Sequence, residues 1–284
     1  MSTDPAAQPT GGSSKTPLVA LTIAGTDSGG GAGIAADLRT FAAHGVFGTL
    51  AVTAVTAQNT VDVQSICVMD VDLVAAQIDA VVSDLAPRAA KTGMLASAAI
   101  VSMVASKARS GQVPVLVVDP VLVASSGDPL FEGTGTAEAY RDLAAVATVI
   151  TPNLPEASLL VGWEISDLAS MEAAATELHA LGPVLVVVKG GHLPGPEAVD
   201  VAYDGRAITH LSAPWVATRN VHGTGCSYSA AIAANLALGC DPLTAALQAK
   251  QYVHRAIVLA SAWQLGSGHG PIDHLGAGSL TGAP

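Results

Sequence analysis

The chain has 284 residues, of which 50% are hydrophobic and 12% are charged, and its formal net charge is −11. With only 12 Lys and Arg residues and no basic run, it is not expected to bind nucleic acid or an anionic membrane surface. The length suits one large α/β domain, and the apolar content requires extensive burial, as in a sheet covered by helices on both faces.

The first residues are low in apolar side chains and the cysteines are few. Residues 1–17 are rich in Ser, Thr, Gly and Pro, so we expect a disordered tail without the basic start and apolar segment of a signal peptide. The three cysteines form no C-x-x-C pair, and no apolar run is long enough to span a bilayer. We therefore expect a cytoplasmic protein with one folded domain over residues 18–275 and a C-terminal tail over 276–284.

In chain order, apolar runs typical of buried strands alternate with segments of helical periodicity. Strands are expected at 18–24, 49–56, 89–94, 113–118, 148–150 and 184–188. Helices are expected at 34–44, 71–85, 97–109, 136–147, 155–161, 171–181, 227–238 and 242–265. A hairpin is expected at 199–203 and 207–211, around Asp204-Gly205. This order predicts a mostly parallel, doubly wound α/β sheet, which binds ligands at the carboxyl ends of its strands.

The turn His222-Gly223-Thr224-Gly225-Cys226 stands immediately before an Ala-rich segment. Free N–H groups at a helix N-terminus bind anions, and glycines let a phosphate approach the backbone. Cys226 would lie where the helix field lowers the pKa of a thiol. A plain glycine-rich helix cap explains the same residues, and the turn by itself favours neither interpretation.

A second glycine-rich loop covers residues 23–34. Residues 31–36 satisfy G-x-G-x-x-A, but the acidic residue expected about 20 positions later in a dinucleotide site is absent. The loop is therefore interpreted as closing around a small ligand. Asp37 could reach that ligand, or it could be an ordinary acid near a helix N-terminus.

The sequence contains no G-x-x-x-x-G-K-[ST] and no H-R-D segment, which excludes P-loop and protein-kinase sites. An ATP site must then be built from strand ends, where Asp119, Asn153, Glu156 and Lys189 stand. Asn153 and Glu156 are spaced to face one Mg²⁺–water cluster, or to cap a helix. The histidines show no zinc spacing, and His222 with Cys226 lacks a visible partner for a cysteine hydrolase.

Nine short segments, taken together and in this order along the chain, match the motifs of a known family, although no single segment is specific enough by itself. They are 21–37 (LTIAGTDSGGGAGIAAD), 56–60 (TAQNT), 91–95 (KTGML), 118–121 (VDPV), 126–130 (SGDPL), 151–157 (TPNLPEA), 189–193 (KGGHL), 222–226 (HGTGC) and 268–271 (GHGP). From Leu18 to His274 the chain resembles the hydroxymethylpyrimidine kinase/phosphomethylpyrimidine kinase family of thiamine biosynthesis, in the ribokinase-like superfamily. The resemblance implies a single ribokinase-like kinase domain.

It also implies ATP- and Mg²⁺-dependent phosphorylation of 4-amino-5-hydroxymethyl-2-methylpyrimidine to its monophosphate and then to the diphosphate, by a homodimer. A pyridoxine/pyridoxal kinase of the same fold is the nearest alternative, since both acceptors are flat hydroxymethyl heteroaromatics. A non-catalytic protein that binds a vitamin precursor is the other.

The resemblance assigns roles to particular positions. Cys226 would be catalytic, where the wider superfamily usually carries an Asp that acts as base. The remaining roles are an anion hole at Gly223, Thr224 and Gly225; substrate contacts at Gly25, Asp37, Gln58, Met94 and Val121; ATP contacts at Asn153, Lys189, Gly223 and Gly225; metal contacts at Glu156 and Asp119; and a mobile flap at 125–135.

Overall fold

The computed structural model describes residues 16–113, 115–122, 131, 135–191, 193 and 195–276. Most of the predicted tails and of the predicted flap at 125–135 lie outside these residues. Within the described part of the chain, no helix is both long and apolar enough to cross a membrane.

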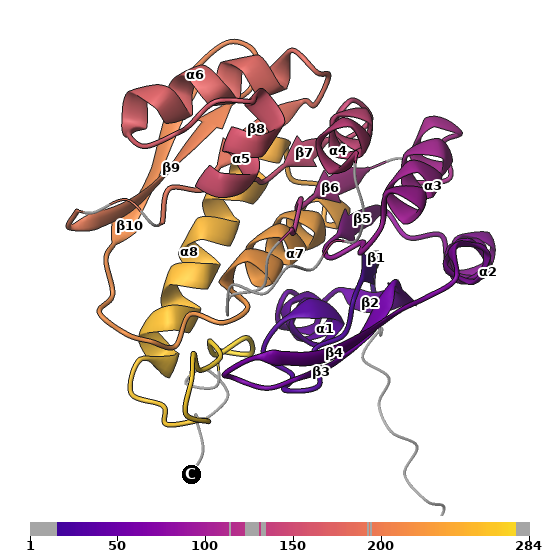
Figure 1. The fold of residues 1–284 in the computed structure, drawn as a ribbon, viewed down its shortest axis with the longest axis horizontal. Helices are drawn as coiled ribbons and strands as arrows, with labels where there is room; N and C mark the ends of the chain where they lie inside the picture. Colours follow the sequence, from indigo (N-terminus) through magenta and orange to yellow (C-terminus); the bar gives the residue numbers. More distant parts are fainter. Residues whose placement is uncertain are drawn as a thin grey trace, which may run out of the picture.

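An eight-stranded sheet runs through the centre of the molecule in the order β10-β9-β8-β7-β6-β5-β1-β2 (Figure 1). Its strands are β1 (Val19–Ala24), β2 (Phe47–Val52), β5 (Ala89–Thr92), β6 (Leu116–Val118), β7 (Val149–Ile150), β8 (Leu185–Val188), β9 (Glu197–Tyr203) and β10 (Ile208–Pro214). Within this sheet the neighbouring strands β2, β1, β5, β6, β7 and β8 pair in parallel. β9 and β10 form an antiparallel hairpin, and β9 pairs antiparallel with β8. The predicted mostly parallel α/β sheet with a hairpin is confirmed.

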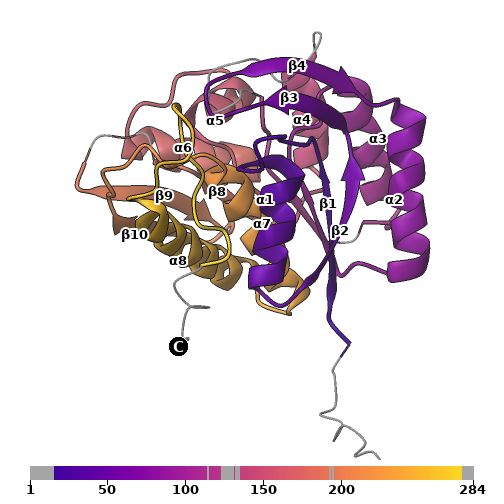
Figure 2. The ribbon, with the colours of Figure 1, turned by 90° about the horizontal axis from the view of Figure 1, so that it is seen from below.

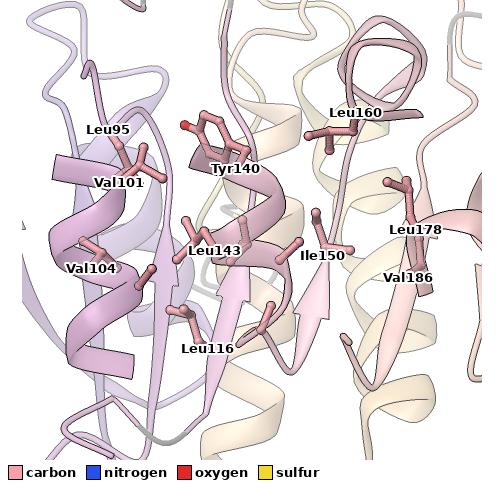
Figure 3. Packing of buried hydrophobic residues seen from close by; sticks show 14 of the residues in the cluster. Leu95, Val101, Val104, Leu116, Tyr140, Leu143, Ile150, Leu160, Leu178 and Val186 are labelled. Atoms are coloured by element: carbon pink, nitrogen blue, oxygen red, sulfur yellow. The ribbon is translucent and has the colours of Figure 1, made fainter. Parts of the chain in front are cut away.

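Helices cover both faces of this sheet. The described helices are α1 (Gly33–Ala43), α2 (Val71–Leu85), α3 (Ala98–Arg109), α4 (Thr136–Ala144), α5 (Leu154–Val161), α6 (Leu168–His179), α7 (Thr224–Ala237) and α8 (Pro242–Ala260). One hydrophobic core lies between one face of the sheet and the helices α2, α3, α4, α5 and α6. Figure 3 shows Tyr140 and Leu143 of α4 packed in this core between Val104 and Ile150. A second core joins α1, α7 and α8 to the other face.

The strand predicted at 49–56 is wrong as a single element. The chain leaves the central sheet after β2, and β3 (Ala54–Gln58) pairs antiparallel with β4 (Val63–Val68) in a separate ribbon, seen at the top of Figure 2. Thr53 marks the break: its N–H donates to Ala24 O at 3.0 Å, and its hydroxyl donates to Met94 O at 2.6 Å. The ribbon is thereby tied to the carboxyl ends of β1 and β5.

Several helix ends also differ from the prediction. α4 ends at Ala144 and not at 147, and α6 spans Leu168–His179 and not 171–181. α7 begins at Thr224, three residues before 227, because Gly223 (φ 85°) acts as its N-cap; Thr224, Gly225 and Cys226 therefore form its first turn. α8 ends at Ala260 and not at 265. The Asn220 amide donates to the carbonyl oxygens of Ala260 at 2.8 Å and Trp263 at 2.9 Å, so a buried side chain satisfies groups at that helix end.

Candidate functional site

The turn from His222 to Cys226 is packed directly on the glycine-rich loop. Gly223 has a φ of 85°, and a Cβ there would lie 1.9 Å from the carbonyl oxygen of Gly31. Only glycine fits such a contact. The first i→i−4 bond of α7 is donated by Ser227 to Gly223 O at 2.9 Å, so the N–H groups of Gly225 and Cys226 precede the helical ladder. The turn has the geometry of an anion site.

A buried ion pair lies against this turn. Lys189, which follows β8, places its Nζ 2.7 Å from Asp119 Oδ1 and 4.0 Å from Glu156 Oε2. A Cβ on Gly225 would be 3.5 Å from Lys189 Nζ and 3.7 Å from Asp119 Oδ2. Ser229 of α7 donates to Asp119 Oδ2 at 3.3 Å. The structure thus brings Asp119, Lys189 and the glycine turn together, as the sequence predicted.

Asn153 and Glu156 serve as a helix cap. The Asn153 N–H donates to Glu156 Oε2 at 2.8 Å, and the Glu156 N–H donates to Asn153 Oδ1 at 2.9 Å, which is a capping box for α5. Glu156 is nevertheless buried beside the ion pair, and burial raises its pKa to about 7 while Lys189 acts to lower it. Burial and the nearby Asp119 carboxylate therefore favour the protonated form of Glu156 more strongly than the Lys189 ammonium favours the ionised form.

Three of the predicted acceptor contacts meet beneath the β3–β4 ribbon. Met94 is buried in a small cluster with Ala54, and Val121 packs against that cluster. A Cβ on Gly25 would be 3.0 Å from Met94 Sδ, so the backbone of Gly25 closely approaches this apolar wall. Such a wall suits a flat ring.

Gln58 ends β3 and is held to the glycine-rich loop by its backbone. Its N–H donates to Ser28 Oγ at 2.7 Å, and the Ser28 hydroxyl donates to Gln58 O at 2.7 Å. Its side-chain Oε1 accepts from Thr56 Oγ1 at 3.3 Å. These backbone bonds fix the start of the side chain, and among the described residues no partner is seen for its amide nitrogen, which could therefore serve a ligand.

Asp37 is not a first-turn acid of α1, and its carboxylate is fully buried. Lys91 Nζ lies 3.0 and 2.9 Å from its two oxygens, and Thr22 Oγ1 donates to it at 2.6 Å. These contacts connect Asp37 to Lys91 and place no exposed oxygen at the predicted acceptor site. Sequence reasoning gave Lys91 no role, although a lysine inside the buried run of β5 was a signal.

Asp27 is a second residue that sequence reasoning missed. Its carboxylate accepts the N–H groups of Gly29 at 2.8 Å, Gly31 at 3.0 Å and Ala32 at 2.8 Å, and it pairs with His222 Nε2 at 2.8 Å. Burial acts to raise the pKa of Asp27, but His222 and the backbone N–H groups hold that pKa below its usual value. The carboxylate thus connects the glycine-rich loop to the turn from His222 to Cys226, called the anion turn below. The two segments are too far apart in the sequence for a local pattern to reveal this contact.

A late segment of the chain completes this corner. The His222 N–H donates to Gly270 O at 3.0 Å, and the His269 N–H donates to Thr60 O at 2.9 Å, in the turn between β3 and β4. In Figure 1 this segment, drawn in yellow, lies beside β3. The 268–274 segment therefore touches both the ribbon and the anion turn.

Asp27→Asn is expected to lower the free energy of unfolding at pH 7 by about 2 kcal/mol, because hydrogen bonds to a charged acceptor are lost. A lowered pKa gives stability above the ordinary Asp pKa of 3.8 that is lost as the pH falls further, so the difference from wild type should shrink below that pH. Urea denaturation at several pH values measures it. The exposed Asp72→Asn is the control, and an equal effect of both substitutions would contradict the assignment.

The thiol of Cys226 differs from its prediction. Burial raises its pKa to about 11, although Lys91 and the Gly33 N–H act to lower it. The expectation that the helix field would lower this pKa is wrong, because desolvation of the half-buried thiol outweighs the field. Cys226 is a neutral thiol at pH 7 in the ligand-free protein.

A family model described as phosphomethylpyrimidine kinase matches residues 27–273. A protein of Rhizobium meliloti named hydroxymethylpyrimidine/phosphomethylpyrimidine kinase is 46% identical over 257 residues, which cover 90% of this chain and 96% of that protein.

Two solved structures are also similar. An ADP complex of Bacillus subtilis pyridoxal kinase matches with a TM-score of 0.84 and 37% identity, over 93% of this chain and 100% of that one. A phosphomethylpyrimidine kinase from Clostridium difficile matches with a TM-score of 0.75 and 38% identity, over 84% of this chain and 99% of that one.

Proposed function

The chain belongs to the phosphomethylpyrimidine kinase family, and from this premise we propose that it phosphorylates 4-amino-5-hydroxymethyl-2-methylpyrimidine with ATP, and then its monophosphate, in thiamine biosynthesis. The observation that carries the proposal is the Lys189–Asp119 pair against Gly225, one residue from the thiol of Cys226. A cation, N–H groups at a helix N-terminus and a thiol for the acceptor hydroxyl thus lie around the first turn of α7.

Phosphoryl transfer depends mainly on positioning and on stabilising the charge of the transferred group. In the proposed anion hole of Gly223, Thr224 and Gly225, the N–H groups of Gly223 and Gly225 would stabilise that charge, because the Thr224 N–H already donates to Val221 O at 3.2 Å. Lys189 would bind the ATP phosphates beside Asn153. Cys226 would contact the acceptor hydroxyl.

The carboxylates of Asp119 and Glu156 suit a Mg²⁺ ion, which prefers oxygen ligands and keeps several waters. The raised pKa of Glu156, caused by burial and also by the charge of Asp119, supports this placement, since a divalent cation would favour the ionised carboxylate. When bound, Mg²⁺ would offset the charge of the ATP phosphates. The protein's part is to hold the ion beside Lys189.

The Mg²⁺ concentration for half-maximal activity is expected to fall as the pH rises from 6 to 8. Burial places the pKa of Glu156 near 7, so its proton competes with the cation at the lower pH and leaves at the higher. Initial rates at varied Mg²⁺ and fixed MgATP measure this. Glu156→Gln should need more Mg²⁺ at every pH and lose the dependence; a wild-type requirement that does not change with pH would exclude Glu156.

The acceptor ring would lie on Met94 and Val121, close to Gly25, with Gln58 bonded to its amino group and ring nitrogen. An amide can donate and accept at once, which matches that edge of the pyrimidine. Asp37 would affect this pocket indirectly, through its ion pair with Lys91.

Gln58→Leu is expected to raise the KM for the pyrimidine about tenfold and to change kcat little, since a lost hydrogen bond of about 1.5 kcal/mol acts on binding. Steady-state kinetics at saturating ATP test it. Gln64→Leu, the same change at an exposed position of β4, is the matched control. A constant KM for Gln58→Leu would place the ring elsewhere.

A pyridoxal kinase activity is the second candidate, favoured by the similarity to the Bacillus subtilis structure. The values of kcat/KM for the pyrimidine alcohol and for pyridoxine, measured in the same assay, decide between them. A higher value for pyridoxine would reject the pyrimidine assignment. A time course of mono- and diphosphate products tests the second phosphorylation.

We also propose that the chain works in the cytoplasm as a homodimer. Exposed apolar side chains gather on the edge strand β2 and on the ribbon, at Phe47, Leu50, Val55 and Val61. Such a surface is typical of an interface. Sedimentation of the purified protein measures its mass, and a monomer at micromolar concentration would refute the dimer.

A further inference from the structure

A buried ion pair remains without a part in the proposed reaction. Lys91 Nζ lies 2.9 and 3.0 Å from the oxygens of Asp37, and neither side chain has exposed surface. Replacing a buried ion pair with apolar side chains is often neutral or stabilising, because desolvating two ions is costly. Stability alone therefore gives no reason for a lysine in the middle of β5.

The orientation of the Lys91 side chain suggests a reason for its place in β5. Side chains alternate along a strand, and Ala89 packs in the core formed with α1, α7 and α8, so Lys91 points to that face. A Cβ on Gly93 would lie 2.8 Å from Lys91 Nζ, which places the ammonium at the carboxyl end of β5. The ammonium has three donors, and in the described part of the chain only Asp37 accepts from it. At least one N–H therefore remains available.

The first turn of α7 faces the same space, and α7 packs against both α1 and β5. Four charged side chains act on the thiol of Cys226: Lys91, Asp37, Asp119 and Lys189. Lys189 is committed to Asp119 at 2.7 Å. The N–H of Gly33, the first residue of α1, also acts to lower the pKa of that thiol, as Lys91 does. Cys226 itself is in the first turn of α7, so Lys91 and the start of α1 are the neighbouring groups that favour its thiolate.

We propose that Lys91, fixed by Asp37 and Thr22, is a positioning residue that acts through Cys226: its buried ammonium favours the thiolate form of Cys226, which then takes the proton of the acceptor hydroxyl. The inference rests on the proposed role of Cys226. The acceptor oxygen forms a bond to the γ-phosphorus of ATP, the bond from that phosphorus to the ADP oxygen breaks, and the hydroxyl proton passes to the thiolate. The thiol later releases this proton to solvent. Lys91 sets how much thiolate is present.

The test measures the thiol without turnover. In a Cys67→Ala/Cys240→Ala background, Cys226 is the one cysteine left of three. Its rate of alkylation by iodoacetamide at pH 8.5, followed by intact mass, should fall about tenfold or more in Lys91→Met, since one pKa unit changes the thiolate fraction tenfold. Lys107→Met, in the half-exposed pair with Asp79 on α2 and α3, should leave the rate unchanged.

A second variant separates this role from a structural one. Lys91→Met leaves the buried Asp37 unpaired and should lower Tm, whereas Lys91→Met/Asp37→Leu should restore Tm and still alkylate several-fold more slowly than wild type. If Lys91→Met does not fold, the double variant decides. Wild-type alkylation in the folded double variant would overturn the proposal. Failure of the proposed reaction would appear separately, as full turnover by Cys226→Ala, because alkylation uses neither ATP nor acceptor.

Discussion

Cys226→Ala is expected to lower kcat about 100-fold or more while changing the dissociation constant of the pyrimidine less than about threefold. A side chain that accepts a proton in the transition state contributes to rate by about this factor, and the ring is held by other residues. Single-turnover phosphorylation with saturating ATP measures the rate, and calorimetric titration measures pyrimidine binding.

The matched control for that substitution is Cys67→Ala, because Cys67 is an exposed thiol on β4, outside the site. Its kcat should equal that of wild type. Equal turnover by Cys226→Ala would remove the thiol from the mechanism and leave the anion turn and Lys189 to explain catalysis.

Gly223→Ala is expected to destabilise the fold by about 3 kcal/mol or more and to abolish most activity. A left-handed φ costs a non-glycine residue about 1 kcal/mol, and here the new Cβ would also collide with the Gly31 carbonyl oxygen at 1.9 Å. Because the obstacle is backbone, the glycine-rich loop itself must move.

Gly162→Ala separates the two contributions. Gly162 has the same φ of +85°, and no heavy atom lies within 4 Å of the position its Cβ would take. Its replacement should cost only the dihedral strain, about 1 kcal/mol. Denaturant unfolding measures the free energy of unfolding of both variants. Equal losses would mean that the glycine-rich loop and the anion turn move apart at little cost to admit the new Cβ.

Local patterns determined much of the fold in advance. The helix predicted at 71–85 is α2 to the residue, because an Asp70 N-cap and steady apolar spacing define both of its ends. The strand at 49–56 was misjudged because both halves are apolar and β-branched. The bonds at the break, from Thr53 to Ala24 O and to Met94 O, are tertiary and leave no local pattern. Order within the sheet also depends on contacts between distant segments.

The residues of the site also fall into those that the sequence predicted and those that it did not. Asp119, Lys189 and the glycine turn were predictable because each follows a strand or precedes a helix, and the carboxyl ends of parallel strands meet at one edge. Asp27 and Lys91 escaped because their partners, His222 and Asp37, are 195 and 54 residues away. No spacing rule connects charges at such separations.

The contacts of the 268–274 segment have a consequence for biosynthesis. A ribosome makes the chain from its N-terminus, so the strands, the β3–β4 ribbon and the anion turn all emerge before Gly270 can accept from His222 and before His269 can bond to Thr60. The contacts that join the β3–β4 ribbon to the turn at His222 are therefore the last of these to form.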